Sequence, residues 1–207
     1  MIPMQYALRR RMMSGGSAFE FTYTGQFTDN IEGSNRVIKF TSSGTLNVSG
    51  SVMADVYMLA GGGGGVSAAA YNMATLGCGG GGGGGHQTVK MKIIAGVYDI
   101  IIGKGGAGKH SQQNSAVIAS GGGDTSAFGI TTTGGNGANV NCSSGNQYAN
   151  GGLGGSPNGL SGNAKWGVNQ TASGGSPNGG DGKTGNYASS GSAKNGGDGY
   201  ITITIPI

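Results

Sequence analysis

The sequence has few charged residues, few cysteines and no long apolar run. Charged residues make up 10% of its 207 residues. No apolar stretch approaches the about 20 residues that a transmembrane helix needs, so we expect no membrane-spanning segment. Two cysteines, Cys78 and Cys142, are too few for a disulfide framework. The pattern favours two separate small residues in a glycine-rich layer.

One cluster accounts for the basic character of the chain. The formal net charge is +4, and Arg9, Arg10 and Arg11 stand together near the N-terminus. Without them, basic and acidic residues nearly balance, so the body has no basic face for a phosphate backbone and we expect no nucleic-acid binding. Residues 1–8 are only mildly apolar, which is not the pattern of a secretory signal. If the protein works outside a cell, a route other than general secretion must take it there, and release by lysis inside an assembled virus would be one.

Motifs for catalysis are also missing. Residues 103–109, GKGGAGK, fit the opening of a phosphate-binding loop. His110 stands where a magnesium-binding Ser or Thr belongs, however, and no helix pattern follows. Neither His86 nor His110 has an acidic partner at a spacing typical of a catalytic triad. We expect no enzyme activity and no cofactor.

Metal-ligand spacing is absent from the sequence as well. Cys78 and Cys142, taken with the two histidines, do not have the spacing of a zinc site. Asp181 and Asp198 each lie in a GGDG sequence, which favours a turn-forming aspartate over a calcium ligand. We therefore expect no metal site.

Glycine is what the sequence has in excess. It contributes 49 residues, including the runs 61–65 and 79–85, against an ordinary share of about 7%. A flexible linker is one interpretation of such a composition. The glycine lies between strands that must meet, which favours an ordered structure instead.

Alternating apolar and polar residues predict β-strands at both ends of the chain. Phe19, Phe21 and Tyr23 alternate with polar residues, as do Ile201 and Ile203. Because strands need neighbours, we expect the last strand to pair with the early ones. The predicted strands are 19–23, 37–40, 45–48, 52–60, 87–92, 97–102 and 200–205.

These strands predict an all-β fold, an antiparallel, jelly-roll-like β-sandwich that carries a glycine-rich layer. We divide the chain into a basic lead (1–18), sandwich strands with glycine runs (19–102), a glycine-rich insertion (103–199) and a closing strand (200–207).

For the glycine layer, we expect packed polyglycine II helices, which have three residues per turn and no internal hydrogen bonds. Packed side by side, such helices can bond N–H to C=O between neighbours, and only glycine allows so close an approach. Collagen is excluded, because no Gly-X-Y phase holds beyond a few triplets. GGSPNG occurs at 154–159 and again at 174–179, which indicates similar short segments joined by turns.

Four sequences carry a resemblance to known proteins: FEFTYTG at 19–25, VMADVYMLAGGGGG at 52–65, GVYDIIIGKGGAG at 96–108 and GGDGYITITI at 196–205. In combination they resemble the glycine-rich domains of bacteriophage tail and tail-fibre proteins. They are also similar to the glycine-rich region of anaplastic-lymphoma-kinase-type receptors.

The resemblance to tip adhesins of long tail fibres implies a virion protein whose end loops bind a bacterial cell-surface receptor. The matching loops are 66–78, 136–150, 160–173 and 183–195. Within them we single out Tyr71, Tyr148, Trp166 and Tyr187, because aromatic side chains anchor interfaces at low entropic cost. The alternative is that these rings cover the glycine block as ordinary core.

Attachment to the particle is the other implied interaction. Tip adhesins begin with a fibre-attachment domain, whereas here a short lead precedes the sandwich. Arg9, Arg10 and Arg11 are candidates for docking to an acidic tail or fibre protein, and the alternative is a solvated chain start. Since fibre proteins are often trimeric, a homo-oligomer is a further expectation.

Two other functions remain open from the sequence. A purely structural virion component, in a baseplate, collar or capsid fibre, would have the same fold without affinity for cells. An ice-binding protein of stacked glycine helices would need a steady triplet phase, and the phase here drifts.

Overall fold

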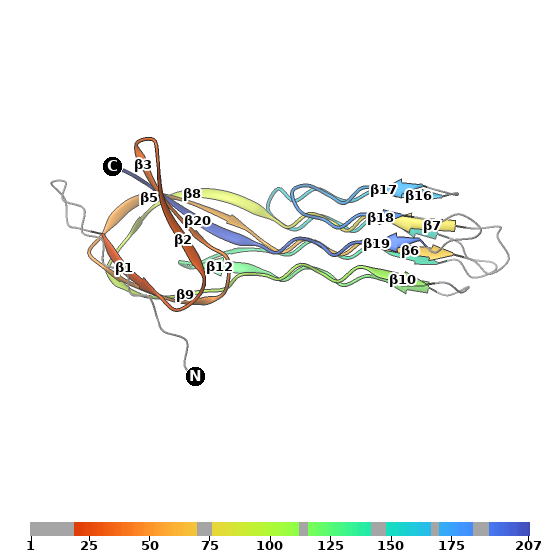
Figure 1. Cartoon of the computed structure of the whole chain (residues 1–207), viewed down its shortest axis with the longest axis horizontal. Helices are drawn as coiled ribbons and strands as arrows, with labels where there is room; N and C mark the ends of the chain where they lie inside the picture. Colours follow the sequence, from red (N-terminus) through yellow and green to blue (C-terminus); the bar gives the residue numbers. More distant parts are fainter. Residues whose placement is uncertain (1–18, 70–75, 112–115, 142–147, 167–169, 184–190) are drawn as a thin grey trace.

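The chain forms an elongated molecule, with a β-sandwich at one end and a bundle of glycine-rich segments at the other (Figure 1). The structure is a computed structural model that describes residues 19–69, 76–111, 116–141, 148–166, 170–183 and 191–207. All regular structure in these ranges is β, and none of them holds a helix that could span a membrane.

The larger sheet of the sandwich has five antiparallel strands in the order β2-β3-β20-β5-β8. The closing strand β20 lies between β3 and β5, where Ile203 pairs with Ile38 on one side and Val56 on the other. The prediction that the last strand pairs with early ones is therefore confirmed. The strands are β2 (Phe27–Glu32), β3 (Asn35–Phe40), β5 (Val52–Leu59), β8 (His86–Ile93) and β20 (Tyr200–Pro206).

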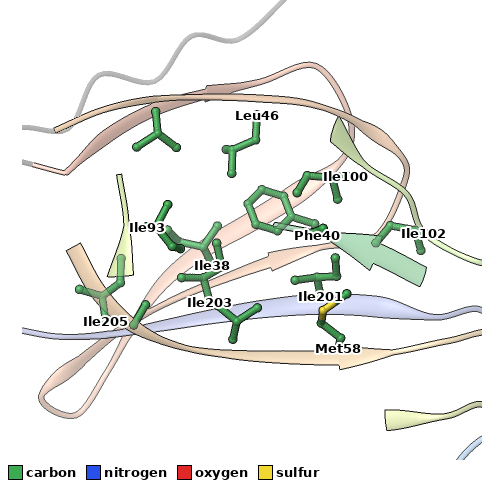
Figure 2. Packing of buried hydrophobic residues seen from close by; sticks show 14 residues of the cluster. Ile38, Phe40, Leu46, Met58, Ile93, Ile100, Ile102, Ile201, Ile203 and Ile205 are labelled. Atoms are coloured by element: carbon green, nitrogen blue, oxygen red, sulfur yellow. The ribbon is translucent and has the colours of Figure 1, made fainter. Parts of the chain in front are cut away.

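The smaller sheet has three antiparallel strands, in the order β1-β4-β9, and faces the larger sheet across the core. Its strands are β1 (Glu20–Tyr23), β4 (Gly44–Ser49) and β9 (Gly96–Ile100). Alternation along β20 buries Ile201, Ile203 and Ile205 and leaves the threonines between them half-buried. Figure 2 shows these isoleucines packed with side chains from both sheets. Labelled there are Ile38, Phe40, Leu46, Met58, Ile93, Ile100 and Ile102.

The sequence missed β2, and the reason is its composition. This strand carries Asp29 and Glu32 and has no clear alternation. Its pairing with β3 positions Asp29 against Arg36, whose Nε and Nη2 bond both carboxylate oxygens at 2.9 and 2.7 Å. The Arg36 guanidinium also lies 5.4 Å from the centre of the Phe21 ring. Arg36 of β3 therefore contacts both the neighbouring strand β2, through Asp29, and the smaller sheet, through Phe21 of β1.

Beyond the sandwich, β5 continues into residues 60–65 and β8 is preceded by residues 80–85. We call these two runs the central segments. Successive backbone N–H groups of residues 60–65 donate to different neighbouring segments, and every third N–H group donates to the same segment. Ala60 donates to Gly85 and Gly63 donates to Gly82. A repeat of three residues per turn, with bonds only between chains, is that of polyglycine II.

Each central segment bonds to six neighbours among the described residues. Segment 60–65 donates to 82–85, 120–123 and 194–197, and accepts from 106–109, 135–138 and Gly180. Segment 80–85 and the amide that follows it bond in the same way with 60–63, 133–136, 152–155, 157–163, Gly175 and 178–180. The pattern is hexagonal packing around two adjacent centres.

The outer segments form a closed ring around this pair. Each bonds to the next one along the chain, and the last returns to the first, since Gly196 donates to Gly106. The outer segments are 103–109, 119–123, 133–138, 152–156, 157–163, 173–176, 178–181 and 194–199. The chain thus winds once around its own two glycine runs, and the packed polyglycine II helices that we predicted are present.

Glycine is needed here because there is no room for a side chain. A Cβ at Gly63 would overlap the carbonyl of Asn136, and one at Gly82 would overlap that of Leu153. Backbone conformation is not the cause, since only Gly33, Gly50 and Gly129 have positive φ among the described glycines. On the outer segments, every third residue faces outward and need not be glycine. Thr133 and Asn136, for example, are exposed at such positions.

One part of the predicted insertion returns to the sandwich. The hairpin of β12 (Thr125–Ala127) and β13 (Ile130–Thr132) follows an outer segment. It bridges to the end of β9 through Ile101 and Ser126, and Ala127 joins the sandwich core. Sandwich and bundle therefore share an interface built partly from residues inside 103–199.

Candidate functional site

At the end farthest from the sandwich, the glycine segments become short strands (Figure 1). We call the described residues of these strands the distal end. Val66, Val140 and Ala138, the last of these in the outer segment that leads into β14, form a small apolar core there. The central segments continue as β6 (Val66–Ala69) and β7 (Leu76–Gly79). The outer segments continue as β10 (Lys109–Ser111), β11 (Ala116–Ile118), β14 (Asn139–Asn141), β15 (Tyr148–Asn150), β16 (Ala164–Trp166), β17 (Thr171–Ala172), β18 (Gly182–Lys183) and β19 (Ser192–Ala193).

Trp166 is one of the predicted contact residues that the structure describes. It ends β16, an edge strand, and pairs with Gly77 of β7. Its ring lies so close to Gly77 that a Cβ there would be 2.8 Å from the ring atom Cζ3. The side chain is nevertheless 40% exposed. Trp166 thus covers the glycine backbone with one part of its surface and presents another part to solvent.

Tyr148, the second described candidate, begins β15 and is 36% exposed. It pairs with Asn141 of β14, and β15 lies beside β16. Asn150, at the other end of β15, donates its amide to Asn139 at 3.1 Å. The structure therefore brings Tyr148 and Trp166 to neighbouring strands at the distal end.

Besides Tyr148 and Trp166, two exposed leucines add apolar surface along the side of the bundle. Leu153 and Leu160 are 64% and 61% exposed. They lie on the two adjacent outer segments that also carry Tyr148 and Trp166, and these segments are linked by the bonds from Gly162 to Gly152 and from Gly159 to Gly155. Sequence reasoning did not select these leucines. The signal for Leu153 was a large apolar residue ahead of two glycines, and that for Leu160 was a large apolar residue two positions before Gly162.

The remaining predicted residues lie outside the part of the chain that the structure describes. These are Tyr71, Tyr187, Arg9, Arg10, Arg11 and Cys142. Cys78, which is described, is buried within β7 and its Sγ lies 3.8 Å from the Lys165 carbonyl oxygen.

The aspartates of the two GGDG sequences lie in extended segments, so their prediction as turn residues was wrong. Asp198 Oδ1 accepts the Gly105 N–H at 2.8 Å and Asp181 Oδ1 accepts the Gly174 N–H at 3.0 Å. Exposed Asp198 and half-buried Asp181 thus accept N–H groups that point out of the ring. The backbone hydrogen bonds, and then Lys104 and Lys194, lower the pKa of both carboxyls.

The segment that resembles a phosphate-binding loop is an outer segment of the bundle. Its amides are engaged there: Gly106 donates to Gly62, Gly105 to Asp198 and Gly108 to the side-chain oxygen of Asn195. It is extended where a phosphate loop would curl around an anion. Among the described residues, no three His, Cys, Asp or Glu side chains gather as metal ligands would.

A protein-family profile matches most of the chain. No curated protein matches the chain. Residues 41–206, which span the sandwich and the bundle, match the sequence profile of the family described as glycine-rich domain. The chain therefore belongs to the glycine-rich domain family.

Proposed function

We propose that this protein is a bacteriophage virion protein of the tail tip or fibre that binds the host cell surface through its distal end. The main observation in support is that Trp166 and Tyr148 are exposed on neighbouring strands at the end farthest from the sandwich. Trp and Tyr are the side chains most enriched where interfaces gain their binding energy.

The bundle supports this proposal because it holds the aromatic residues on a rigid base. Trp166 lies against Gly77, and β7 continues directly from a central segment whose neighbours surround it. A ring that is fixed before binding loses little conformational entropy in the complex. The sandwich at the other end leaves its outer surfaces for attachment to the particle.

Binding of labelled protein to a panel of intact bacteria tests the proposal. We expect saturable binding to some strains. Trp166→Ala should weaken it by about thirtyfold, the effect of removing an interface side chain that contributes about 2 kcal/mol. Trp166→Phe, which keeps a ring over Gly77, should retain much of the affinity.

Two controls separate binding from folding. Tyr148→Ala removes the neighbouring ring without uncovering Gly77, and it should also weaken binding. Val97→Ala truncates a side chain that is 68% exposed on the sandwich, and it should bind as the parent does. Thermal unfolding of each variant establishes that it is folded. Folded distal variants that bind cells like the parent would contradict the proposal.

A purely structural virion component is the second candidate. Exposed apolar side chains at the sandwich end favour it: Met53 is 50%, Ile94 is 55% and Val97 is 68% exposed. Such a protein would bind no cells. Its Val97→Glu variant would fail to enter particles, because a charge in a buried contact is costly. Cell binding by the parent protein would exclude this candidate.

A further inference from the structure

The acidic residues of this protein avoid the distal end. The 8 Asp and Glu residues of the sequence all lie on the sandwich or in the extended part of the bundle. They are Glu20, Asp29, Glu32, Asp55, Asp99, Asp124, Asp181 and Asp198. The segments 70–75, 112–115, 142–147, 167–169 and 184–190, which the structure does not describe, contain no charged residue in the sequence.

Basic residues, in contrast, occur in three of the distal strands. Lys109 lies in β10, Lys165 in β16 and Lys183 in β18. The side chains of Lys109 and Lys165 are exposed. No carboxylate of the described residues forms an ion pair with either, and none remains elsewhere in the sequence to do so. The distal end is therefore positively charged.

The other two lysines of the bundle are neutralised. Lys104 bonds Asp198 at 2.9 Å, and Lys194 bonds Asp181 at 3.0 Å. Charge is balanced along the bundle and unbalanced at its distal end. The molecule therefore has a positive electrostatic field at this end, where it would meet a partner. The two exposed distal lysines stand on opposite edge strands of the sheet β10-β6-β7-β16, so this field spans the end.

The neighbours of these lysines indicate the kind of partner. Trp166 follows Lys165 in β16, and Tyr148 and Asn150 lie on the adjacent strand β15. Exposed aromatic faces carry a negative quadrupole that attracts the C–H groups of a sugar ring. Side-chain amides can both donate to and accept from hydroxyls. Lysines attract phosphate or carboxylate groups.

We propose that the distal end binds an acidic polysaccharide of the bacterial envelope, one whose sugars carry phosphate or carboxylate groups. This inference rests on the proposed function and names the partner of the same site. A neutral glycan would leave the lysines unused. A nucleic acid would need a longer track of cations along its backbone.

Direct binding to immobilised bacterial polysaccharides tests the inference. The probes are purified glycans in three sets, which are phosphorylated, uronate-containing and neutral. We expect binding to acidic members only, with affinity that falls as ionic strength rises, because exposed charges are screened. The phosphorylated and uronate sets distinguish the two sources of charge.

Charge variants assign the binding to the distal end. Lys109→Gln together with Lys165→Gln should weaken binding to the acidic glycan by about tenfold, as expected for two exposed ion pairs. The matched control, Lys90→Gln with Lys92→Gln, removes the same charge from exposed positions on the sandwich and should have no effect.

The outcomes separate this inference from the proposed function. Equal binding to neutral and acidic glycans would overturn it, as would indifference to the distal double variant. Cell binding that is lost after protease treatment of the bacteria, with no binding to any glycan, would show a protein receptor instead. In that case the inference fails and the proposed function stands. Failure of the parent to bind any cell would count against the proposed function, whereas the glycan assay decides the inference by itself.

Discussion

At the scale of single residues, this structure depends on the absence of side chains. The amide of Gly63 bonds Gly82, its carbonyl accepts from Gly180, and the position of its missing Cβ is occupied by the carbonyl of Asn136. A residue in such a site has backbone on all sides. Glycine contributes here through close approach of chains, as at the axis of collagen.

A pair of glycine substitutions tests this interpretation. Gly63→Ala should destabilise the protein by about 3 kcal/mol or more, because the bundle cannot open around one segment without losing several backbone bonds. Gly121→Ala is the control, since a Cβ at this exposed outer position would meet its nearest atom at 3.4 Å. It should be neutral or slightly stabilising. Thermal unfolding of both variants measures the difference, and equal stability of the two would contradict the close-packing argument.

At the scale of elements, the repeated GGSPNG sequence has one structural role. Both copies turn the chain between antiparallel outer segments. In each copy, the asparagine side chain donates a hydrogen bond to a central segment or to the residue that follows it. Asn158 donates to the carbonyl of His86 at 3.0 Å, and Asn178 donates to that of Ala60 at 3.0 Å. The copies differ in what else they hold. Asn178 also donates to Gly197 at 2.9 Å and accepts from the Gly84 N–H at 2.8 Å.

Because the two copies differ in these hydrogen bonds, we expect replacement of their asparagines to have unequal effects on stability. Asn178→Gly should cost about 2–3 kcal/mol, because it removes several hydrogen bonds of partly buried backbone groups. Asn158→Gly removes one bond and relieves a positive φ of 63, so it should cost about 1 kcal/mol or less. Chemical denaturation of the matched pair measures both. An equal loss of stability in the two variants would show that the turn, not the amide, is what matters.

At the scale of the whole molecule, the order of the chain joins the sandwich and the bundle. The closing strand β20 comes after the last outer segment, yet it lies between β3 and β5 at the centre of the large sheet. The central segment 60–65 is the direct continuation of β5. Neither part can lose its structure without releasing a strand or a segment that the other needs.

We therefore expect the sandwich and the bundle to unfold in one transition. Calorimetry should give a single peak whose calorimetric and van't Hoff enthalpies agree. The Gly63→Ala variant should shift this peak as a whole, since the substitution lies in the bundle but the transition is shared. Two separated peaks, of which only one moves in the variant, would contradict this prediction.

Most of the fold could be predicted from the sequence. Alternation located β1, β8 and β20, because a strand with one buried face has a period of two, and short apolar runs between turn residues located β3, β4, β5 and β9. All lie close to their observed bounds. Strands at both ends of the chain also required the last one to pair with the early ones. The glycine runs indicated polyglycine II, since no other residue permits contact between backbones.

Part of the candidate site could also be predicted from the sequence. Aromatic residues between glycine clusters pointed to Tyr148 and Trp166, which the structure places on neighbouring strands. That the two exposed leucines lie on adjacent segments, and that charge is unbalanced at the distal end, was not foreseen. Both depend on which outer segments are adjacent, and local sequence does not record adjacency.

The sequence by itself determined the class of structure, because period-two alternation and the loss of side chains are local properties of the chain. Tertiary structure alone decided which glycine runs are central. Segments 61–65 and 80–85 differ from outer segments in having six neighbours instead of an exposed face, so that no residue of theirs can carry a side chain. It also decided where charge remains unpaired, since Lys104 meets Asp198 across 94 residues of chain and Lys165 meets no acid. The physical reason is that packing and ion pairing act through space, between residues that the chain separates.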